Sequence, residues 1–137
     1  MKKKILIVSG IVILAIVAGA LYYTFRKSPD SVKNMKPDYI VDASVLVDEF
    51  MEDENATNQK YLDKIIQVEG NIVEIEEAQD ENTLVYLEGN LMGNISCQFN
   101  NGELDKEKIA IGKTVTVKGK CTGFILDVVL TKCALVE

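Results

Sequence analysis

The chain has 137 residues, of which 47% are hydrophobic, and its formal net charge is −6. Five of the 15 basic residues lie in the first 27 positions and all 21 acidic residues follow them, which leaves the body from position 28 onward at a net −11. A body this acidic argues against a nucleic-acid-binding surface, and its apolar strands argue against a disordered chain. The absence of histidine removes Ser-His and Cys-His nucleophile pairs and histidine-based zinc sites.

An uncharged apolar stretch occupies residues 5–25. As a helix rising 1.5 Å per residue it reaches about 31 Å, the thickness of a bilayer's hydrocarbon core. Tyr22 and Tyr23 near its end, followed by Arg26 and Lys27, are typical of a membrane interface, and the lysines at positions 2–4 favour a cytoplasmic N-terminus. We therefore predict a single-pass inner-membrane anchor at residues 1–27, with the remaining chain outside the cytoplasm.

The alternative interpretation of this segment is a cleaved secretory signal. The lysines at positions 2–4 supply a charged start, and Ala18-Gly19-Ala20 matches the small-residue cleavage pattern. Against cleavage, the apolar run continues past Ala20, and the product would begin with the exposed apolar residue Leu21. Since no cysteine lies near this segment, a lipid-modified N-terminal cysteine is excluded.

A linker and a helix are expected next. Residues 28–38 are polar and contain both prolines, Pro29 and Pro37, so we interpret them as a short, stiff linker. Residues 41–52 place apolar side chains at positions 46, 47, 50 and 51, the spacing of one helix face. This pattern predicts an amphipathic helix packed against a β core, with its acidic residues in solvent.

The rest of the chain has the pattern of a β domain. Alternating apolar residues predict strands at 65–75, 83–87, 94–99, 114–121 and 124–136, with a short helical piece at 102–111 and a two-residue turn at Thr122-Gly123. Gly70 and Gly119, each inside a strand, are expected where a small barrel bends. Five strands with a helix between the third and fourth follow the OB-fold order. The predicted fold class is mainly β, a five-stranded OB-fold barrel with its leading helix at residues 39–137.

Several short motifs in this domain carry a family resemblance. They are Val68-Glu-Gly70-Asn-Ile72, Ile95-Ser-Cys97-Gln-Phe99, Gly112-Lys-Thr-Val-Thr-Val-Lys-Gly119-Lys-Cys121-Thr-Gly123 and Asp127-Val-Val-Leu130. Together they resemble the tRNA-anti-like family of OB-fold lipoproteins, over roughly Tyr39 to Val136. The resemblance implies an OB fold and a location in the bacterial envelope, and it brings no catalytic residue with it. A shared fold does not establish that the chain binds nucleic acid.

The function we predict is a membrane-anchored, non-enzymatic binding module without cofactor or metal, whose partner is an envelope protein, peptide or glycan. OB barrels bind ligands across their second and third strands. With Val85, Leu87, Ile95, Cys97 and Phe99 expected inside, the candidate binding residues on the outer face are Tyr86, Ser96 and Gln98.

Two other functions are less favoured by the sequence. Single-stranded nucleic-acid binding would use Tyr86, Phe99 or Phe124 as stacking platforms, but the acidic loop at 76–81 and the acidic body disfavour it. An enzyme could use Glu74 and Glu76 as paired carboxylates, yet acidic residues at alternate positions of a strand usually form a solvated face.

The three cysteines, Cys97, Cys121 and Cys133, allow one disulfide in an oxidising compartment, or none if they are small buried hydrophobes. They have no zinc-site spacing. If Thr122-Gly123 is a two-residue turn, Cys121 and Cys133 lie about 30 Å apart along the ladder. Strands three and five of an OB barrel are neighbours, so the predicted bond is Cys97–Cys133. The apolar positions also change face within the last strand, which predicts a bulge near Thr131.

Overall fold

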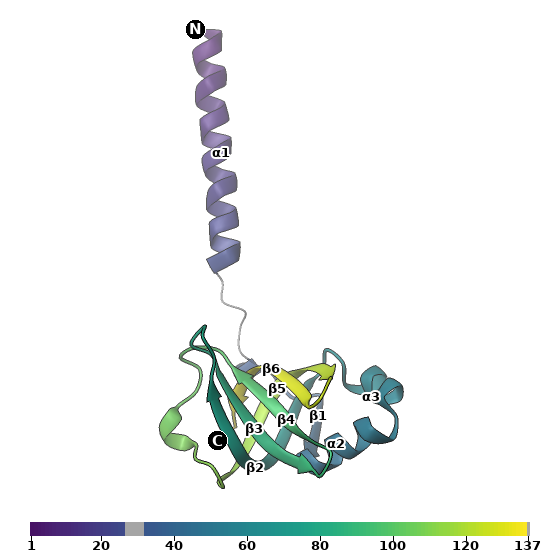
Figure 1. The fold of residues 1–137 in the computed structure, drawn as a ribbon. Coiled ribbons are helices and arrows are strands. Elements are labelled where there is room, and N and C mark those ends of the chain that lie inside the picture. The colour runs from purple at the N-terminus through teal and green to yellow at the C-terminus, as the bar shows by residue number, and fades with distance from the viewer. Residues whose placement is uncertain (27–31, 137) are drawn as a thin grey trace. The chain divides into compact units, whose positions relative to one another are not determined.

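The structure, a computed structural model, describes residues 1–26 and 32–136. They form two compact units, an N-terminal helix and a β domain (Figure 1). Helix α1 (Lys2–Arg26) contains a span, Lys2–Tyr23, that is long and apolar enough to cross a membrane. The predicted apolar helix is therefore confirmed, and both an anchor and a signal segment fit it. Part of the predicted linker, residues 28–31, lies outside the described residues.

Five strands close into a barrel. They are β2 (Ile65–Glu77), β3 (Thr83–Asn90), β4 (Gly93–Phe99), β5 (Thr114–Phe124) and β6 (Val128–Leu135). Their order is β2-β3-β4-β6-β5, and the β2–β5 pairing closes the ring. The β4–β6 pair is parallel and the other pairs are antiparallel. This is the OB-fold arrangement, so the predicted fold class is confirmed.

Short elements precede the barrel. Helical turn η1 (Val32–Asn34) buries Val32, and the Lys118 Nζ donates to the carbonyl of Lys33 at 3.0 Å, so this part of the predicted linker packs on the barrel. Strand β1 (Tyr39–Asp42) then pairs in parallel with β2. Helix α2 (Ala43–Glu52) follows directly, and it begins two residues later than the predicted helix because positions 41 and 42 belong to β1.

Helix α3 (Glu54–Tyr61) was not predicted from the sequence. Its residues are polar on most sides, so it lacks an apolar stripe that would reveal a helical period. It starts because the Asp53 carboxylate accepts a hydrogen bond from the Ala56 backbone N–H at 3.1 Å, a helix N-cap. Between β4 and β5 the expected helical piece is reduced to the single turn η2 (Lys106–Lys108).

The core lies inside the barrel and under α2. All five residues predicted to point inward are buried: Val85, Leu87, Ile95, Cys97 and Phe99. From α2, Leu46, Val47 and Phe50 are buried in the same core, and the Phe50 ring stacks on Phe124 with 5.7 Å between centroids. The amphipathic face predicted for this helix thus packs against the barrel.

The two strand glycines allow close packing. A Cβ on Gly119 would lie 2.6 Å from the Cys133 Sγ, and a Cβ on Gly70 would lie 2.9 Å from the Ala43 Cβ. Each distance is shorter than side-chain atoms tolerate. The structure therefore explains Gly70 and Gly119 by the side chains they face, a reason that differs from the predicted bends.

The last hairpin differs from the prediction in one respect and agrees in another. The predicted turn at Thr122-Gly123 is wrong, because β5 continues to Phe124 through a register shift and the connecting loop is 125–127. The predicted bulge is confirmed, since the register changes between Thr131 and Ala134, where Lys132 has φ 54°. The extra residue lets both Leu130 and Cys133 point into the core.

Candidate ligand-binding face

The outer face of β3 and β4 brings the three predicted binding residues together. Tyr86 pairs with Ser96 across the two strands, and Leu84 pairs with Gln98. All four side chains are half-buried and alternate with the core residues. This arrangement follows from the two-residue side-chain period of a strand. Binding by Tyr86, Ser96 and Gln98 stays a prediction.

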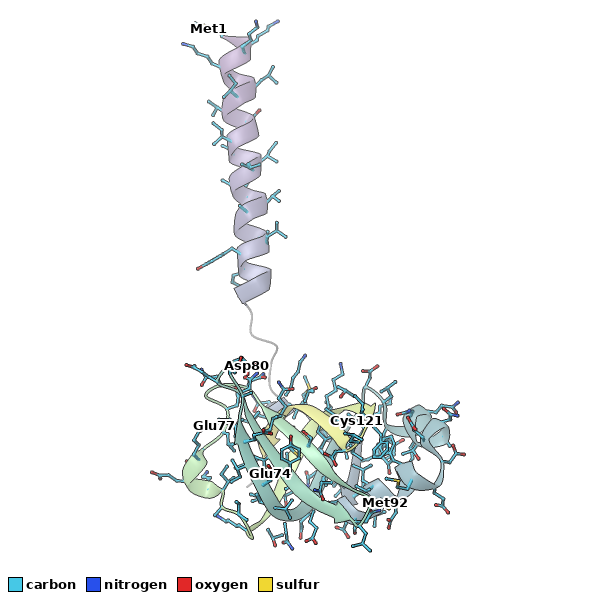
Figure 2. All side chains as sticks on the ribbon, viewed as in Figure 1. Met1, Glu74, Glu77, Asp80, Met92 and Cys121 are labelled. Carbon is cyan, nitrogen blue, oxygen red and sulfur yellow. The ribbon has the colours of Figure 1, made fainter. Side chains whose placement is uncertain are left out.

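Strand β2 extends the same face with two carboxylates, those of Glu74 and Glu76. Figure 2 labels Glu74. Glu74 pairs with Tyr86 and Glu76 pairs with Leu84. The Tyr86 hydroxyl donates a hydrogen bond to the Glu76 Oε2 at 3.2 Å. We call Glu74, Glu76, Tyr86, Ser96 and Gln98 the tyrosine face. The aromatic ring of this face is that of Tyr86, and it lies beside the carboxylates of Glu74 and Glu76.

The pKa of Tyr86 is raised, first by partial burial and then by its hydrogen bond to Glu76 and the negative charge of Glu74. The carboxylates of Glu74 and Glu76 disfavour a further negative charge on the Tyr86 oxygen. Tyr86 therefore stays a neutral donor at physiological pH. An anionic ligand that approaches the ring meets the same repulsion.

The acidic pair was visible in the sequence but its partner was not. Sequence periodicity placed Glu74 and Glu76 on one strand face, and only the β2–β3 register shows that this face is also that of Tyr86. The short connection between β2 and β3 was the available signal, because the length and type of a hairpin turn fix the register of its two strands. Within the described residues, no cluster of three or more cysteine, aspartate or glutamate side chains could hold a metal ion.

The β2–β3 turn beside this face is also acidic, as the labels of Glu77 and Asp80 in Figure 2 show. Lys106 forms an ion pair with Glu77 and lowers the pKa of that carboxyl through a hydrogen bond and its charge. The Asn101 side chain donates to Glu81 at 2.6 Å. An open depression of about 330 Å³ lies among these residues. Its one lining lysine is already engaged by a carboxylate.

The other aromatic residues that could stack on a base are less accessible. Phe99 is buried in the core, and Phe124 stacks on Phe50. Stacking platforms for single strands need exposed rings beside cations that track the backbone. Of the three predicted platforms, Tyr86 alone lies on the outer face, and it is hydrogen-bonded to a carboxylate.

The three cysteines are free and buried in the structure. Burial and a hydrogen-bonding contact with Cys97 both raise the pKa of Cys133, which places these two thiols together. Cys133 also faces Gly119, two residues along the strand from Cys121, so the argument that separated Cys121 and Cys133 by a long ladder was wrong. The Cys97–Cys133 bond stays a prediction.

A family model described as tRNA-anti-like matches residues 1–135. The chain belongs to the tRNA-anti-like family. No curated protein matches this member. Among solved structures, it is similar to a crystal structure from Klebsiella pneumoniae, described as a candidate nucleic acid-binding lipoprotein, at 19% identity and a TM-score of 0.60. The match covers 72% of this chain and 92% of that one. At this identity the likeness shows the shared fold, which agrees with the OB barrel of the tRNA-anti-like family.

Proposed function

We propose that this tRNA-anti-like protein is a membrane-anchored, non-enzymatic binding module whose OB domain lies outside the cytoplasm. Helix α1 supplies a span long enough to cross a bilayer, and the lysines at positions 2–4 favour a cytoplasmic N-terminus. The similar Klebsiella pneumoniae protein is described as a lipoprotein, which is consistent with a membrane-attached OB domain.

The ligand binds on the tyrosine face. The observation that carries this proposal is the hydrogen bond from Tyr86 to Glu76, because it places an aromatic ring, carboxylates and an amide side chain on the outer strands that OB barrels use for binding. Such a face suits a basic or uncharged polar partner. We therefore propose an envelope protein, peptide or glycan as the ligand.

Nucleic acid is the alternative that the description of the Klebsiella pneumoniae protein suggests. The tyrosine face argues against it, since Glu74 and Glu76 flank the ring on which a base would stack. Nucleic-acid affinity comes largely from lysine and arginine that displace counterions from phosphates. A gel shift at low salt that shows no complex at micromolar protein is the expected result, and a salt-sensitive complex lost in Tyr86→Ala would reverse the assignment.

The direct test is a crosslinking pulldown of the full-length protein from its native envelope. The variant Tyr86→Ala combined with Gln98→Ala is expected to lose the specific partner, since both side chains would contact it. Gln67→Ala is the matched control, because Gln67 is a half-buried strand residue that pairs with β1 and β5, away from the tyrosine face. An unchanged partner set in the double variant would refute the site.

A further inference from the structure

Two neighbouring turns of the barrel expose large apolar side chains. In the β3–β4 turn, Leu91 is 104% exposed and Met92 is 72% exposed. In the β5–β6 turn, Ile125 and Leu126 are each 82% exposed. We call these four residues the tip patch. Figure 2 labels Met92 at the end of the barrel away from Asp80.

The two turns are held side by side. The Asn94 backbone N–H donates to the Asp127 Oδ1 at 2.9 Å, which joins the start of β4 to the β5–β6 turn. A Cβ on Gly93 would lie only 3.0 Å from the Leu126 carbonyl oxygen, so the two backbones are in close contact. The tip patch is therefore one surface built from two hairpins.

The fold does not require apolar residues at these positions. The Asn90 Oδ1 accepts hydrogen bonds from the backbone N–H groups of Met92 at 2.7 Å and Gly93 at 3.1 Å, so Asn90 closes the first turn. Turn positions in water are usually taken by Gly, Asn, Asp, Ser or Pro, whose backbone preferences suit them. Four exposed aliphatic side chains at two adjacent turns are instead typical of a surface that is covered in use.

We infer that the tip patch inserts into the hydrocarbon of the bilayer that α1 crosses, an inference that rests on the proposed membrane anchoring. The chain between Arg26 and Val32 extends to at most about 20 Å, so the domain cannot diffuse away from an anchored helix. Tethering makes lipid contact intramolecular and raises its effective concentration.

The shape and charge of the tip patch favour lipid over a protein partner. Its side chains project from turns, and a bilayer accommodates a projecting apolar surface, whereas a protein partner must supply a matching pocket. The charged side chains in these hydrogen bonds are carboxylates: Asp127 accepts from the Asn94 backbone N–H, and Asp48 accepts from the Asn90 side chain at 2.6 Å. Insertion is therefore driven by apolar burial and does not depend on anionic headgroups.

The protein contains no tryptophan, which allows a single-tryptophan test. Full-length Leu91→Trp and Leu126→Trp are reconstituted into phosphatidylcholine vesicles, with and without lipids brominated on their acyl chains. We expect a blue-shifted emission that brominated lipid quenches several-fold. Ile111→Trp is the matched control, since Ile111 is 70% exposed and precedes the start of β5, whereas the β5–β6 turn of the tip patch follows the end of that strand; its emission should be unquenched.

Each outcome separates the alternatives. Leu91→Trp emission that brominated lipid leaves unchanged overturns the inference, as does equal quenching of Ile111→Trp. A blue shift that grows with the protein-to-lipid ratio and resists bromine would show that a second copy covers the patch, and this also overturns it. Leu14→Trp in α1 reports the anchor by itself: quenching there with none at Leu91 rejects only the tip patch, and no quenching at Leu14 rejects the anchor as well.

A charge substitution supplies the second measurement. Leu126→Asp in the Leu91→Trp background is expected to weaken insertion about tenfold or more, because burying one leucine side chain favours the apolar phase by at least that factor. Ile111→Asp in the same background should leave the quenching unchanged. Quenching that survives Leu126→Asp in full would contradict insertion through the joined turns.

Discussion

Strand β3 connects two turns of opposite chemistry. Near its start, Glu77 at the end of β2 and Asp80 and Glu81 in the β2–β3 turn make polar contacts with their surroundings. At its end, the β3–β4 turn carries Leu91 and Met92, both exposed. The same core lies beneath both turns, because the inward residues of β3 are buried along its length. The contrast shows that one buried core supports turns whose exposed side chains have opposite chemistry.

Both turns are nevertheless closed by an asparagine. At the acidic end, the Asn82 side chain donates to the Asp80 Oδ2 at 2.8 Å and accepts from the Asn101 backbone at 3.1 Å. At the apolar end, Asn90 accepts from Met92 and Gly93. Side-chain amides that bond nearby backbone groups are a common means of closing turns. The difference between the ends therefore lies in the residues that project, and the following substitutions test that separation.

The largest effect is expected from Gly89→Ala, at the apolar end. A Cβ there would lie 2.3 Å from the Gly93 carbonyl oxygen and 2.5 Å from a Val47 methyl carbon, so backbone and helix α2 must both move. We expect a loss of about 3 kcal/mol in unfolding free energy, measured by urea denaturation.

Gly102→Ala is the matched control at the acidic end. A Cβ on Gly102 would meet no atom within 4 Å, but this residue has φ 82°, a conformation unfavourable to side chains. The expected loss is about 1 kcal/mol. Equal losses at Gly89 and Gly102 would contradict the close packing of the apolar end.

The second prediction concerns the core that both ends share. Burial raises the pKa of the Cys133 thiol and also that of the less deeply buried Cys121 thiol. The unfolded thiols ionise near pH 8.5 while the folded ones stay protonated, so the contribution of these thiols to stability is constant below that pH and falls above it. Each thiol contributes a slope of at most about 1.4 kcal/mol per pH unit.

Urea denaturation of the reduced protein between pH 7 and pH 9.5 measures this slope, and Cys133→Ala should reduce it. Protein oxidised at Cys97 and Cys133 no longer has the Cys133 thiol, whose pKa is raised, and should show a smaller slope than the reduced form. Mass spectrometry without reductant, on protein from the oxidising compartment, tests the bond directly: three free thiols would refute the predicted disulfide. A reduced protein with no alkaline loss would contradict buried, protonated thiols.

The two turn asparagines should have smaller and similar effects. Asn90→Ala leaves the Met92 and Gly93 N–H groups without their acceptor, and Asn82→Ala does the same to the Asn101 N–H. We expect each to lower the unfolding free energy by about 1 kcal/mol. Hydrogen exchange should become faster at the Met92 and Gly93 amides in Asn90→Ala, and at the Asn101 amide of the β4–β5 loop in Asn82→Ala. A full loss of stability in one variant alone would mean that the two turns do not depend equally on their asparagine.

The sequence predicted the barrel strands well because their inward positions alternate strictly. The face predicted from Val85, Leu87, Ile95, Cys97 and Phe99 is the buried one, and the bulge in the last strand followed from the change of face near Thr131. Strand β1 and helix α3 were not predicted, and each omission has a physical reason. The first has four residues, too few to show a period, and the second is polar on most sides.

The candidate site was predicted in part. Tyr86, Ser96 and Gln98 were placed on the outer face by strand parity alone, which the register confirms. The carboxylates beside Tyr86 come from β2, and cross-strand neighbours depend on a register that one sequence does not reveal. The Thr122-Gly123 turn failed because the bulge at that point lets β5 continue for one more residue after Gly123.

The smallest effect on stability is expected at the tip patch itself. Leu91→Ser and Leu126→Ser remove side chains that are almost fully exposed and that close neither turn, so the unfolding free energy should change by less than about 0.5 kcal/mol. Glu81→Gln at the acidic turn should change the unfolding free energy equally little, since the hydrogen bond between Glu81 and Asn101 is exposed.

A loss above about 1 kcal/mol at either leucine would mean that the tip patch packs within the domain, and it would remove the reason to look for a surface that covers it. Unchanged stability, combined with weaker lipid quenching in the same Leu126→Ser variant, would separate the two roles of the β5–β6 turn. The Asp127 carboxylate joins the two hairpins by accepting from the Asn94 N–H, and the side chains of Ile125 and Leu126 would contact the bilayer. The residues that build the barrel and the residues that contact a partner would then be different sets at the apolar end. The proposal for the tyrosine face makes the same separation on β3, where half-buried residues alternate with buried ones.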